Sequence, residues 1–219
     1  MTIQAVMFDV IGTTVMENPG TVQQCFLSAF SKNQIDIDPA FIQANRGKEK
    51  KEVIDRFIRE KNLPFEIGAT IYQSFADEIK TNVAQFFPVP GAVDLFDFLR
   101  EKHISVCLGT GLSRELFELI LHHIKWNPAS FAYTGTSSEI KVGRPNPSMI
   151  VDMMNKLSVT NPKRVIKIGD TSADIHEGRN AGVITAALLS GTQGNDVLAR
   201  EKPDILLDTL SDLKRFTFG

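Results

Sequence analysis

The chain lacks the features that mark secreted, membrane-spanning and nucleic-acid-binding proteins. Only two of its 219 residues are cysteines, Cys25 and Cys107, which excludes a disulfide framework and favours two reduced, packed thiols. No apolar run is long enough to span a bilayer, and a net charge of −2 provides no basic surface for nucleic acid. The first residues show no signal-peptide pattern, so we expect a cytoplasmic protein.

A proton-transferring side chain is also missing near the N-terminus, beside a conspicuous carboxylate. The apolar residues 5–8 are followed by the segment Asp9-Val-Ile-Gly-Thr-Thr14. An Asp at the end of a buried strand, before a Gly turn, directs its carboxylate into the crevice where open α/β sheets bind ligands. Two residues later stands Ile11, which cannot transfer protons. The segment therefore predicts a carboxylate nucleophile, Asp9, without a neighbouring acid/base partner.

Apolar segments alternate with amphipathic ones along most of the chain. The continuous apolar segments predict strands at residues 5–9, 104–108, 131–134, 164–169, 184–189 and 205–207. Helical periodicity lies between them, at residues 92–102, 113–123, 147–157 and 174–181. Strands that are apolar throughout are typical of a parallel sheet covered on both faces. We therefore expect an α/β fold with a Rossmann-like parallel sheet core and helices on both faces.

One long region breaks this alternation. From about residue 22 to residue 87 the pattern is helical only, with candidates at residues 22–30, 51–59 and 67–86. Pro and Gly punctuate both of its ends, at residues 18–20 and 88–91. We therefore predict an all-helical cap domain, residues 17–88, inserted into a core domain made of residues 1–16 and 89–219.

Two later segments supply candidate anion-binding residues. Thr110 and Gly111 follow the strand predicted at 104–108, where a small hydroxyl and a bare backbone can donate to phosphate oxygens at a helix N-terminus. Arg144, or alternatively Lys141, lies in a Pro-rich turn that holds a cation where it can pair with a phosphoryl group. Each segment alone is a weak signal for a phosphate site.

A second acidic segment follows the strand predicted at 164–169. Asp170 stands at its end and Asp174 one helical turn later, so both carboxylates can face the same pocket as Asp9. Such an oxygen-rich set suits Mg²⁺. The alternative is purely structural, with Asp170 as a helix cap and Asp174 as a partner of the helix dipole.

Together and in this order, these segments resemble the four signature motifs of the haloacid dehalogenase superfamily. The resemblance covers the whole chain and places the cap after the first strand. It implies that Asp9 is the nucleophile, that Arg144 is the third-motif cation and that Mg²⁺ is the cofactor. The implied phosphate-binding residues are Gly12, Thr13, Thr110 and Gly111, and the implied metal ligands are Asp9, the backbone carbonyl of Ile11, Asp170 and Asp174.

Ile11 narrows the resemblance to one branch. Phosphatases of the superfamily carry a second Asp at this position as general acid/base. Phosphonoacetaldehyde hydrolases do not, and residues 110–115, 142–147 and 169–178 are similar to theirs. The 2-haloacid dehalogenases also lack the second Asp but need no metal, and a carboxylate pair without a metal would repel their substrate.

The cap adds a further point of resemblance to this branch. Its Gly-X-X-Lys segment, whose Lys forms a Schiff base with the substrate aldehyde, is similar to Gly47-Lys-Glu-Lys50. The resemblance thus implies a catalytic Lys50, whose protonated imine would accept the electrons of a breaking C–P bond. The alternative is that Lys50 belongs to a solvated charged run. The chain departs from this branch at three positions, where Met, His and Tyr are replaced by Arg46, Val53 and Leu112. Arg46 suits a second anionic group of the substrate, such as a carboxylate.

We therefore expect a hydrolase that cleaves a C–P or P–O bond of a small phosphonate or phosphate through an aspartyl-phosphate. The alternatives are a Mg²⁺-dependent small-molecule phosphatase and a catalytically weak scaffold that binds a phosphorylated ligand or a partner protein. The resemblance also makes a homodimer through the cap plausible, unless the apolar stripe of residues 22–30 packs within the cap.

Overall fold

A central parallel sheet organises the chain, of which a computed structural model describes residues 2–140 and 142–216. Its strands are β1 (Ala5–Asp9), β4 (Ser105–Thr110), β5 (Tyr133–Thr136), β6 (Val165–Gly169), β7 (Ile184–Leu188) and β8 (Ile205–Leu207). They pair in the order β5-β4-β1-β6-β7-β8, and every pair is parallel. In the register, Phe8 of β1 lies between Leu108 and Ile168. The first strand is therefore central, with its carboxyl end at the middle of one sheet edge.

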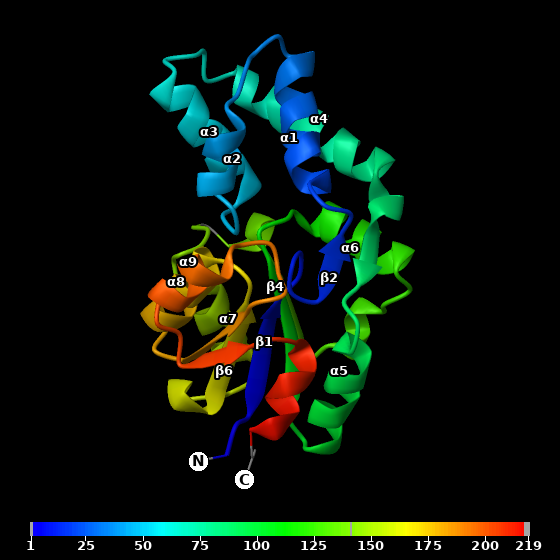
Figure 1. Cartoon of the computed structure of the whole chain (residues 1–219), viewed down its shortest axis with the longest axis vertical. Helices are drawn as coiled ribbons and strands as arrows, with labels where there is room; N and C mark the ends of the chain where they lie inside the picture. Colours follow the sequence, from blue (N-terminus) through cyan, green and yellow to red (C-terminus); the bar gives the residue numbers. More distant parts are fainter. Residues whose placement is uncertain (1, 141, 217–219) are drawn as a thin grey trace.

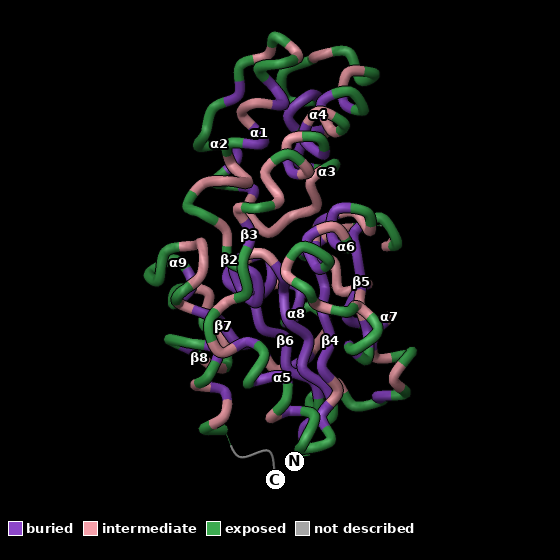
Figure 2. Tube along the Cα trace, turned by 90° about the vertical axis from the view of Figure 1, so that its right-hand side faces the viewer, coloured by how far each residue is buried: buried purple, intermediate pink, exposed green. Residues whose placement is uncertain are grey.

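Helices cover both faces of this sheet, as expected (Figures 1 and 2). The core helices are α5 (Ala92–Glu101), α6 (Arg114–His123), α7 (Ser148–Lys156), α8 (Ser172–Asn180) and α9 (Asn195–Arg200). Short 3-10 turns occur at Val83–Gln85, Pro128–Ser130, Ser137–Glu139, Pro162–Arg164 and Leu210–Arg215. Along β1, Val6 and Phe8 join the apolar cluster beneath α5 and α6, whereas Ala5 and Met7 join the one beneath α7. Burial on both faces explains why the strand is apolar throughout.

The helical segment between the first strand and α5 lies over the carboxyl end of the sheet (Figure 1). Its helices are α1 (Thr21–Lys32), α2 (Pro39–Ala44), α3 (Lys50–Glu60) and α4 (Ile67–Thr81). Ring contacts hold them together, with centroid distances of 4.5 Å for Phe26–Phe75 and 5.0 Å for Phe30–Phe57. The apolar stripe of α1 is therefore buried within the cap. The domain limits at residues 17 and 88, and a homodimer, stay predictions.

Two short strands at the base of the cap correct the sequence analysis, which expected no strand there. Strand β2 (Val15–Glu17) pairs antiparallel with β3 (Phe86–Pro88). The helix expected at 67–86 consequently ends at Thr81. Three-residue strands are stabilised by each other across a long stretch of sequence, so local periodicity does not reveal them. Helix α2 was also missed, although Asp38 caps it and Pro39 opens it. The remaining predicted strand bounds and core helix bounds agree within two residues.

Both cysteines are buried and unpaired, as expected. Burial raises the pKa of each thiol to about 12, so both are inert packing groups. No helix within residues 2–140 and 142–216 combines the length and the apolar character that a membrane crossing requires.

Candidate active site

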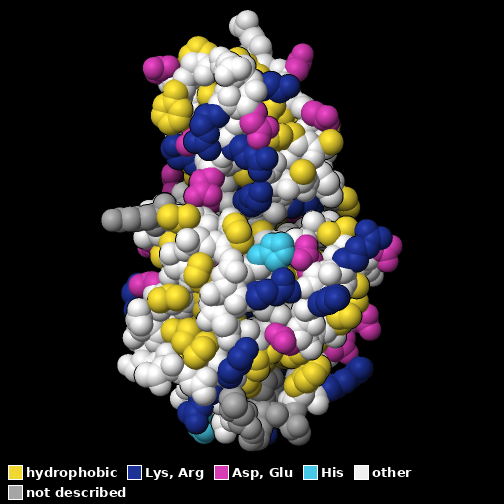
Figure 3. Space-filling model, turned by 90° about the vertical axis from the view of Figure 1, so that its left-hand side faces the viewer, with side chains coloured by type: hydrophobic (Ala, Val, Ile, Leu, Met, Phe, Trp, Pro, Cys, Tyr) yellow, Lys and Arg dark blue, Asp and Glu magenta, His cyan; other side chains and the backbone are white. Residues whose placement is uncertain are grey.

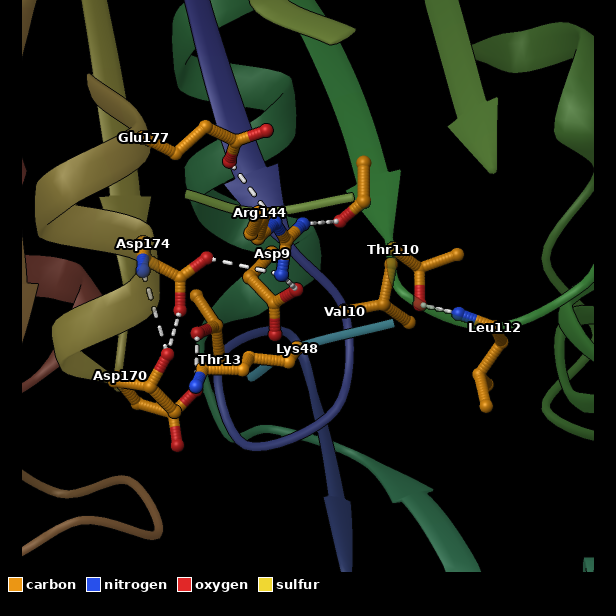
Figure 4. A network of polar contacts seen from close by, with 12 residues as sticks. Asp9, Val10, Thr13, Lys48, Thr110, Leu112, Arg144, Asp170, Asp174 and Glu177 are labelled. Atoms are coloured by element: carbon orange, nitrogen blue, oxygen red, sulfur yellow. Dashed lines mark hydrogen bonds and ion pairs between the residues drawn. The ribbon is translucent and has the colours of Figure 1, made fainter. Parts of the chain in front are cut away.

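Three buried carboxylates meet at the carboxyl edge of the sheet (Figure 4). Asp9 ends β1, Asp170 directly follows β6, and Asp174 lies in the first turn of α8. Because β1 and β6 are parallel neighbours, their ends lie side by side. One oxygen of each carboxylate lies within 4.8 Å of an oxygen of the other two. The structure thus brings together the three acidic residues that the sequence analysis singled out.

The loops around Asp170 fix the position of its carboxylate. Thr13 donates its hydroxyl to one oxygen at 2.9 Å, and the backbone amide of Thr192 donates to the other at 2.7 Å. Gly12 has a φ of +95°, and a Cβ on it would lie 2.2 Å from Asp170, so only glycine fits this turn. The hydroxyl of Thr13 therefore contacts Asp170 in this structure, and its predicted contact with a phosphate stays a prediction.

Arg144 connects the carboxylates. Its guanidinium lies 2.5 Å from Asp9 Oδ1, 3.1 Å from Asp174 Oδ1 and 2.9 Å from Glu177 Oε2. It also donates to the backbone carbonyl of Gly109 at 2.7 Å. The cation therefore holds one oxygen of Asp9, and among the described residues the other oxygen has no hydrogen bond or ion pair. The alternative cation, Lys141, lies outside the described residues.

A second buried cation and a fourth carboxylate were missed by the sequence analysis. Lys167 Nζ, from the middle of β6, lies 3.0 Å from Asp174 Oδ1 and 3.3 Å from Glu177 Oε2. A signal for both existed in the sequence. Lys167 interrupts an otherwise apolar strand, and Glu177 follows Asp174 at the three-residue spacing that puts two side chains on one helix face.

The charges of this cluster do not cancel. Among the described residues every buried charged side chain belongs to it, and four carboxylates face only Arg144 and Lys167. Burial, followed by the charges of Asp9 and Asp174, raises the pKa of Asp170 to about 7. Burial also raises the pKa of Asp9, and this effect outweighs the opposing charge of Arg144. The two uncompensated negative charges and the oxygen ligands fit a divalent metal ion held by Asp9, Asp170 and Asp174.

The mutual repulsion of the buried carboxylates gives a prediction about metal binding. We expect Mg²⁺ at about 100 times its dissociation constant to stabilise the wild type by about 2.7 kcal/mol, or roughly 5–10 °C in Tm. In Asp170→Asn the repulsion is gone, one hydrogen bond from Thr13 or Thr192 is lost with it, and the Mg²⁺-induced shift disappears. Asp94→Asn, at an exposed Asp in the first turn of α5, should keep the full shift. Thermal melts with and without Mg²⁺ measure this, and equal shifts in wild type and Asp170→Asn contradict it.

The buried cation gives a prediction about stability. The side chain of Lys167 is 0% exposed. Lys167→Met removes its ion pairs with Asp174 and Glu177. Breaking a buried ion pair from one side costs about 3–5 kcal/mol. Lys156→Met is the matched control, since that lysine is 64% exposed and its pair with Asp152 contributes at most about 1 kcal/mol. Urea unfolding of both variants measures the difference, and similar small losses would refute the role of Lys167.

A cavity of about 70 Å³ lies above Asp9, between the core and the cap. Its core side includes Asp9 and Arg144, together with Thr110 and Gly111 at the end of β4. Its cap side combines the apolar Phe26, Ile42 and Val53 with polar and charged residues. The side chain of Ile11 borders the cavity as well, so no proton-transferring group stands there next to Asp9. A charged core side and a cap side with both apolar and charged residues fit a small anion with a short carbon skeleton.

Lys50 reaches this cavity from the first residue of α3. Its Nζ donates to the backbone carbonyl of Lys48 at 3.0 Å. Burial lowers the pKa of its amine, which increases the neutral fraction that can attack a carbonyl. Basic side chains do gather on one exposed face of the cap (Figure 3), and Lys51 is exposed and pairs with Asp55 at 2.7 Å. Lys50 is therefore a cavity residue, unlike its solvated neighbour.

Close backbone contacts seat the cap loop that carries Lys50 on the core. A Cβ on Gly47 would lie 2.2 Å from Thr171 Oγ1, and one on Gly111 would lie 3.0 Å from the carbonyl oxygen of Lys48. The amide of Gly143 donates to Glu52 at 2.9 Å. These contacts explain how a cap residue comes to face Asp9.

Arg46 and Leu112 also border the cavity. The guanidinium of Arg46 donates to Gln43 Oε1 at 2.7 Å and to the backbone carbonyl of Thr192 at 3.4 Å. Leu112 donates its amide to the hydroxyl of Thr110 at 3.2 Å. The binding roles of Arg46 and Thr110, and the carbonyl of Ile11 as a metal ligand, stay predictions.

A parallel sheet with a carboxylate cluster at its carboxyl edge, beneath a helical cap, defines the protein as a capped α/β enzyme. The family model described as haloacid dehalogenase-like hydrolase matches residues 6–188, and the chain belongs to this family. The expected superfamily and its hydrolase class are thereby confirmed.

The relatives of the chain bear out the resemblance to one branch. The chain is 31% identical over 206 residues to a phosphonoacetaldehyde hydrolase of Lactiplantibacillus plantarum. The match covers 88% of this chain and 78% of the relative. A phosphonoacetaldehyde hydrolase-like protein from Oleispira antarctica has a similar fold, with a TM-score of 0.85, 23% identity and coverage of 98% and 91%. A hydrolase from Pseudomonas syringae gives a TM-score of 0.86 at 19% identity, with coverage of 97% and 96%. The two structural likenesses support the fold.

Proposed function

We propose that this hydrolase cleaves the C–P bond of a small phosphonate that carries a carbonyl group one carbon from phosphorus. Asp9 is the nucleophile, Lys50 forms a Schiff base with the carbonyl, and Mg²⁺ is the metal ion. The observation that carries the proposal is the placement of Lys50. An amine whose pKa is lowered by burial borders the same small cavity as the nucleophile.

The proposed covalent steps take place on Lys50 and Asp9. The neutral amine of Lys50 adds to the carbonyl carbon, and loss of water gives a protonated imine. The free oxygen of Asp9 then attacks phosphorus, the C–P bond breaks, and its electron pair moves into the imine to give an enamine. Protonation at carbon and hydrolysis release the aldehyde from Lys50. Water then hydrolyses the aspartyl-phosphate on Asp9.

Other groups hold the reactants in place. Arg144 fixes one oxygen of Asp9, and Thr110 and Gly111, which border the cavity, would donate to the phosphonate oxygens. Asp9, Asp170, Asp174 and the carbonyl of Ile11 would hold Mg²⁺, which when bound neutralises charge on the phosphonate.

Ile11 favours this reaction over ordinary ester hydrolysis. A leaving alkoxide needs a general acid, and Ile11 supplies none, whereas the electrons of a C–P bond pass into the imine instead. The second candidate is a Mg²⁺-dependent phosphatase for esters with good leaving groups. It is favoured by Val53 and Leu112, apolar residues of the cavity where the phosphonate-cleaving branch has polar side chains.

Comparing two substrates tests the proposal. We expect phosphate release from phosphonoacetaldehyde in the presence of Mg²⁺, at a kcat/KM at least about 100-fold above that for p-nitrophenyl phosphate. Turnover of p-nitrophenyl phosphate alone would instead establish the phosphatase. Absence of turnover with either compound would favour a scaffold that binds a phosphorylated ligand or a partner.

A further inference from the structure

Glu17 is a carboxylate of the cavity that neither the metal cluster nor the nucleophile uses. It ends β2, at the base of the cap, and borders the cavity together with Lys50. Its Oε2 accepts the backbone amide of Val22 at 2.7 Å, which fixes the side chain against the start of α1. Across residues 2–140 and 142–216, its Oε1 has neither a hydrogen-bond donor nor a cation within ion-pair distance. One oxygen of Glu17 is therefore held and the other is available.

The surroundings of Glu17 suit a carboxyl group that holds a proton and can donate it. Burial raises its pKa, and the charges of Arg46 and Lys50 from the cap oppose this effect without reversing it. Asp9 and Arg144 face the same cavity from the core. Glu17 thus keeps its proton to a higher pH than a solvated glutamate, and its pKa responds to the charge of Lys50.

Imine formation needs such a group, and the cavity offers few. The oxygen of the carbinolamine must leave as water, which requires a proton donor. The titratable side chains that border the cavity are Asp9, Glu17, Arg46, Lys50 and Arg144. Arginine does not release protons in proteins, Asp9 attacks phosphorus, and Lys50 is the nucleophile toward carbon. Val53 and Leu112 have no proton to give. Among the described residues that border the cavity, Glu17 is therefore the one side chain left to act as the proton donor.

We propose that Glu17 is the general acid of Schiff-base formation at Lys50. In the balanced step, the amine of Lys50 forms the C–N bond and the carbonyl oxygen becomes a hydroxyl by transfer of an ammonium proton. The carboxyl of Glu17 then gives its proton to this hydroxyl, the C–O bond breaks and water leaves. The products are the protonated imine and the Glu17 carboxylate, which stabilises the cationic imine. This inference rests on the proposed function.

Glu17→Gln tests the assignment, because the amide keeps an oxygen for the Val22 hydrogen bond but cannot donate an acidic proton. We expect the single-turnover rate of borohydride-trapped adduct formation on Lys50 to fall by about 100-fold or more. Hydrolysis of p-nitrophenyl phosphate, which needs no imine, should stay within about threefold of wild type. Glu60→Gln, at an exposed glutamate of α3, is the matched control and should change neither rate.

Chemical rescue separates a proton donor from a structural residue. Glu17 also borders a second, larger cavity that it shares with Arg46 and Thr192, which gives a small acid access to the vacated position. We expect acetate to restore part of the adduct rate in Glu17→Ala and to leave the wild type unchanged. An adduct rate of Glu17→Gln equal to that of wild type overturns the inference while the proposed function stands. Equal loss of both activities in Glu17→Gln, without rescue in Glu17→Ala, also overturns it. Failure of the wild type itself to form an adduct overturns the proposed function.

Discussion

Lys50→Arg is expected to lower phosphate release from phosphonoacetaldehyde by about 10³-fold or more, while hydrolysis of p-nitrophenyl phosphate stays within about threefold of wild type. Arginine is also basic and keeps most of the length of the side chain, but it cannot form the imine. Without an imine, the electron pair of the C–P bond has no acceptor. Steady-state assays of the purified variant with both substrates measure this separation.

The neighbouring lysine provides the control for this prediction. Lys51→Arg should change neither activity, because Lys51 is exposed and pairs with Asp55. Two results would contradict the role of Lys50. One is Lys50→Arg with wild-type turnover of phosphonoacetaldehyde, and the other is an equal loss on both substrates, which would mean that Lys50 only shapes the cavity.

Asp9→Asn is expected to remove both activities together, by at least about 10⁴-fold. The amide cannot attack phosphorus, and this attack is common to C–P and P–O cleavage. The variant should fold, because Arg144 keeps its contacts with Asp174, Glu177 and the carbonyl of Gly109. Rapid-quench assays with both substrates, with circular dichroism as a check on folding, measure the effect.

The outcome that would contradict this role is specific. If Asp9→Asn lost C–P cleavage but kept ester hydrolysis, a second nucleophile would have to serve the ester reaction. Asp94→Asn, at an exposed carboxylate far along the chain, should retain both activities. The variants at residues 9 and 50 thus test two steps separately: attack of Asp9 on phosphorus, and imine formation between Lys50 and the carbonyl carbon.

The core of the fold follows from the sequence because its signals are local. Strand β1 is buried on both faces and is therefore a continuous apolar segment in the sequence, and β6 is apolar except at Lys167. Asp9 and Asp170 stand where such strands end, and adjacent parallel strands bring those ends together. Arg144 was predicted instead from its Pro-rich turn, with Lys141 as the alternative, and its guanidinium lies against Asp9 in the structure.

The missed features depend on contacts between distant segments. The pairing of β2 with β3 joins residues that are about seventy positions apart, and neither strand is long enough to be detected alone. Lys167 and Glu177 are buried only because Asp174 and Arg144 compensate their charges. The sequence raised the choice between a catalytic and a solvated Lys50 but did not decide its position. Its place in the cavity depends on the seating of the cap loop on the core.

Covalent attachment of a carbonyl substrate to Lys50, above Asp9, is the step on which the proposed function depends. The most direct measurement is peptide mass spectrometry of the wild-type protein after incubation with Mg²⁺, phosphonoacetaldehyde and borohydride. We predict a reductive alkyl adduct on the peptide that contains Lys50, absent when either the substrate or borohydride is omitted. Absence of an adduct, or an adduct spread over Lys48 and Lys51 instead of Lys50, would contradict the account.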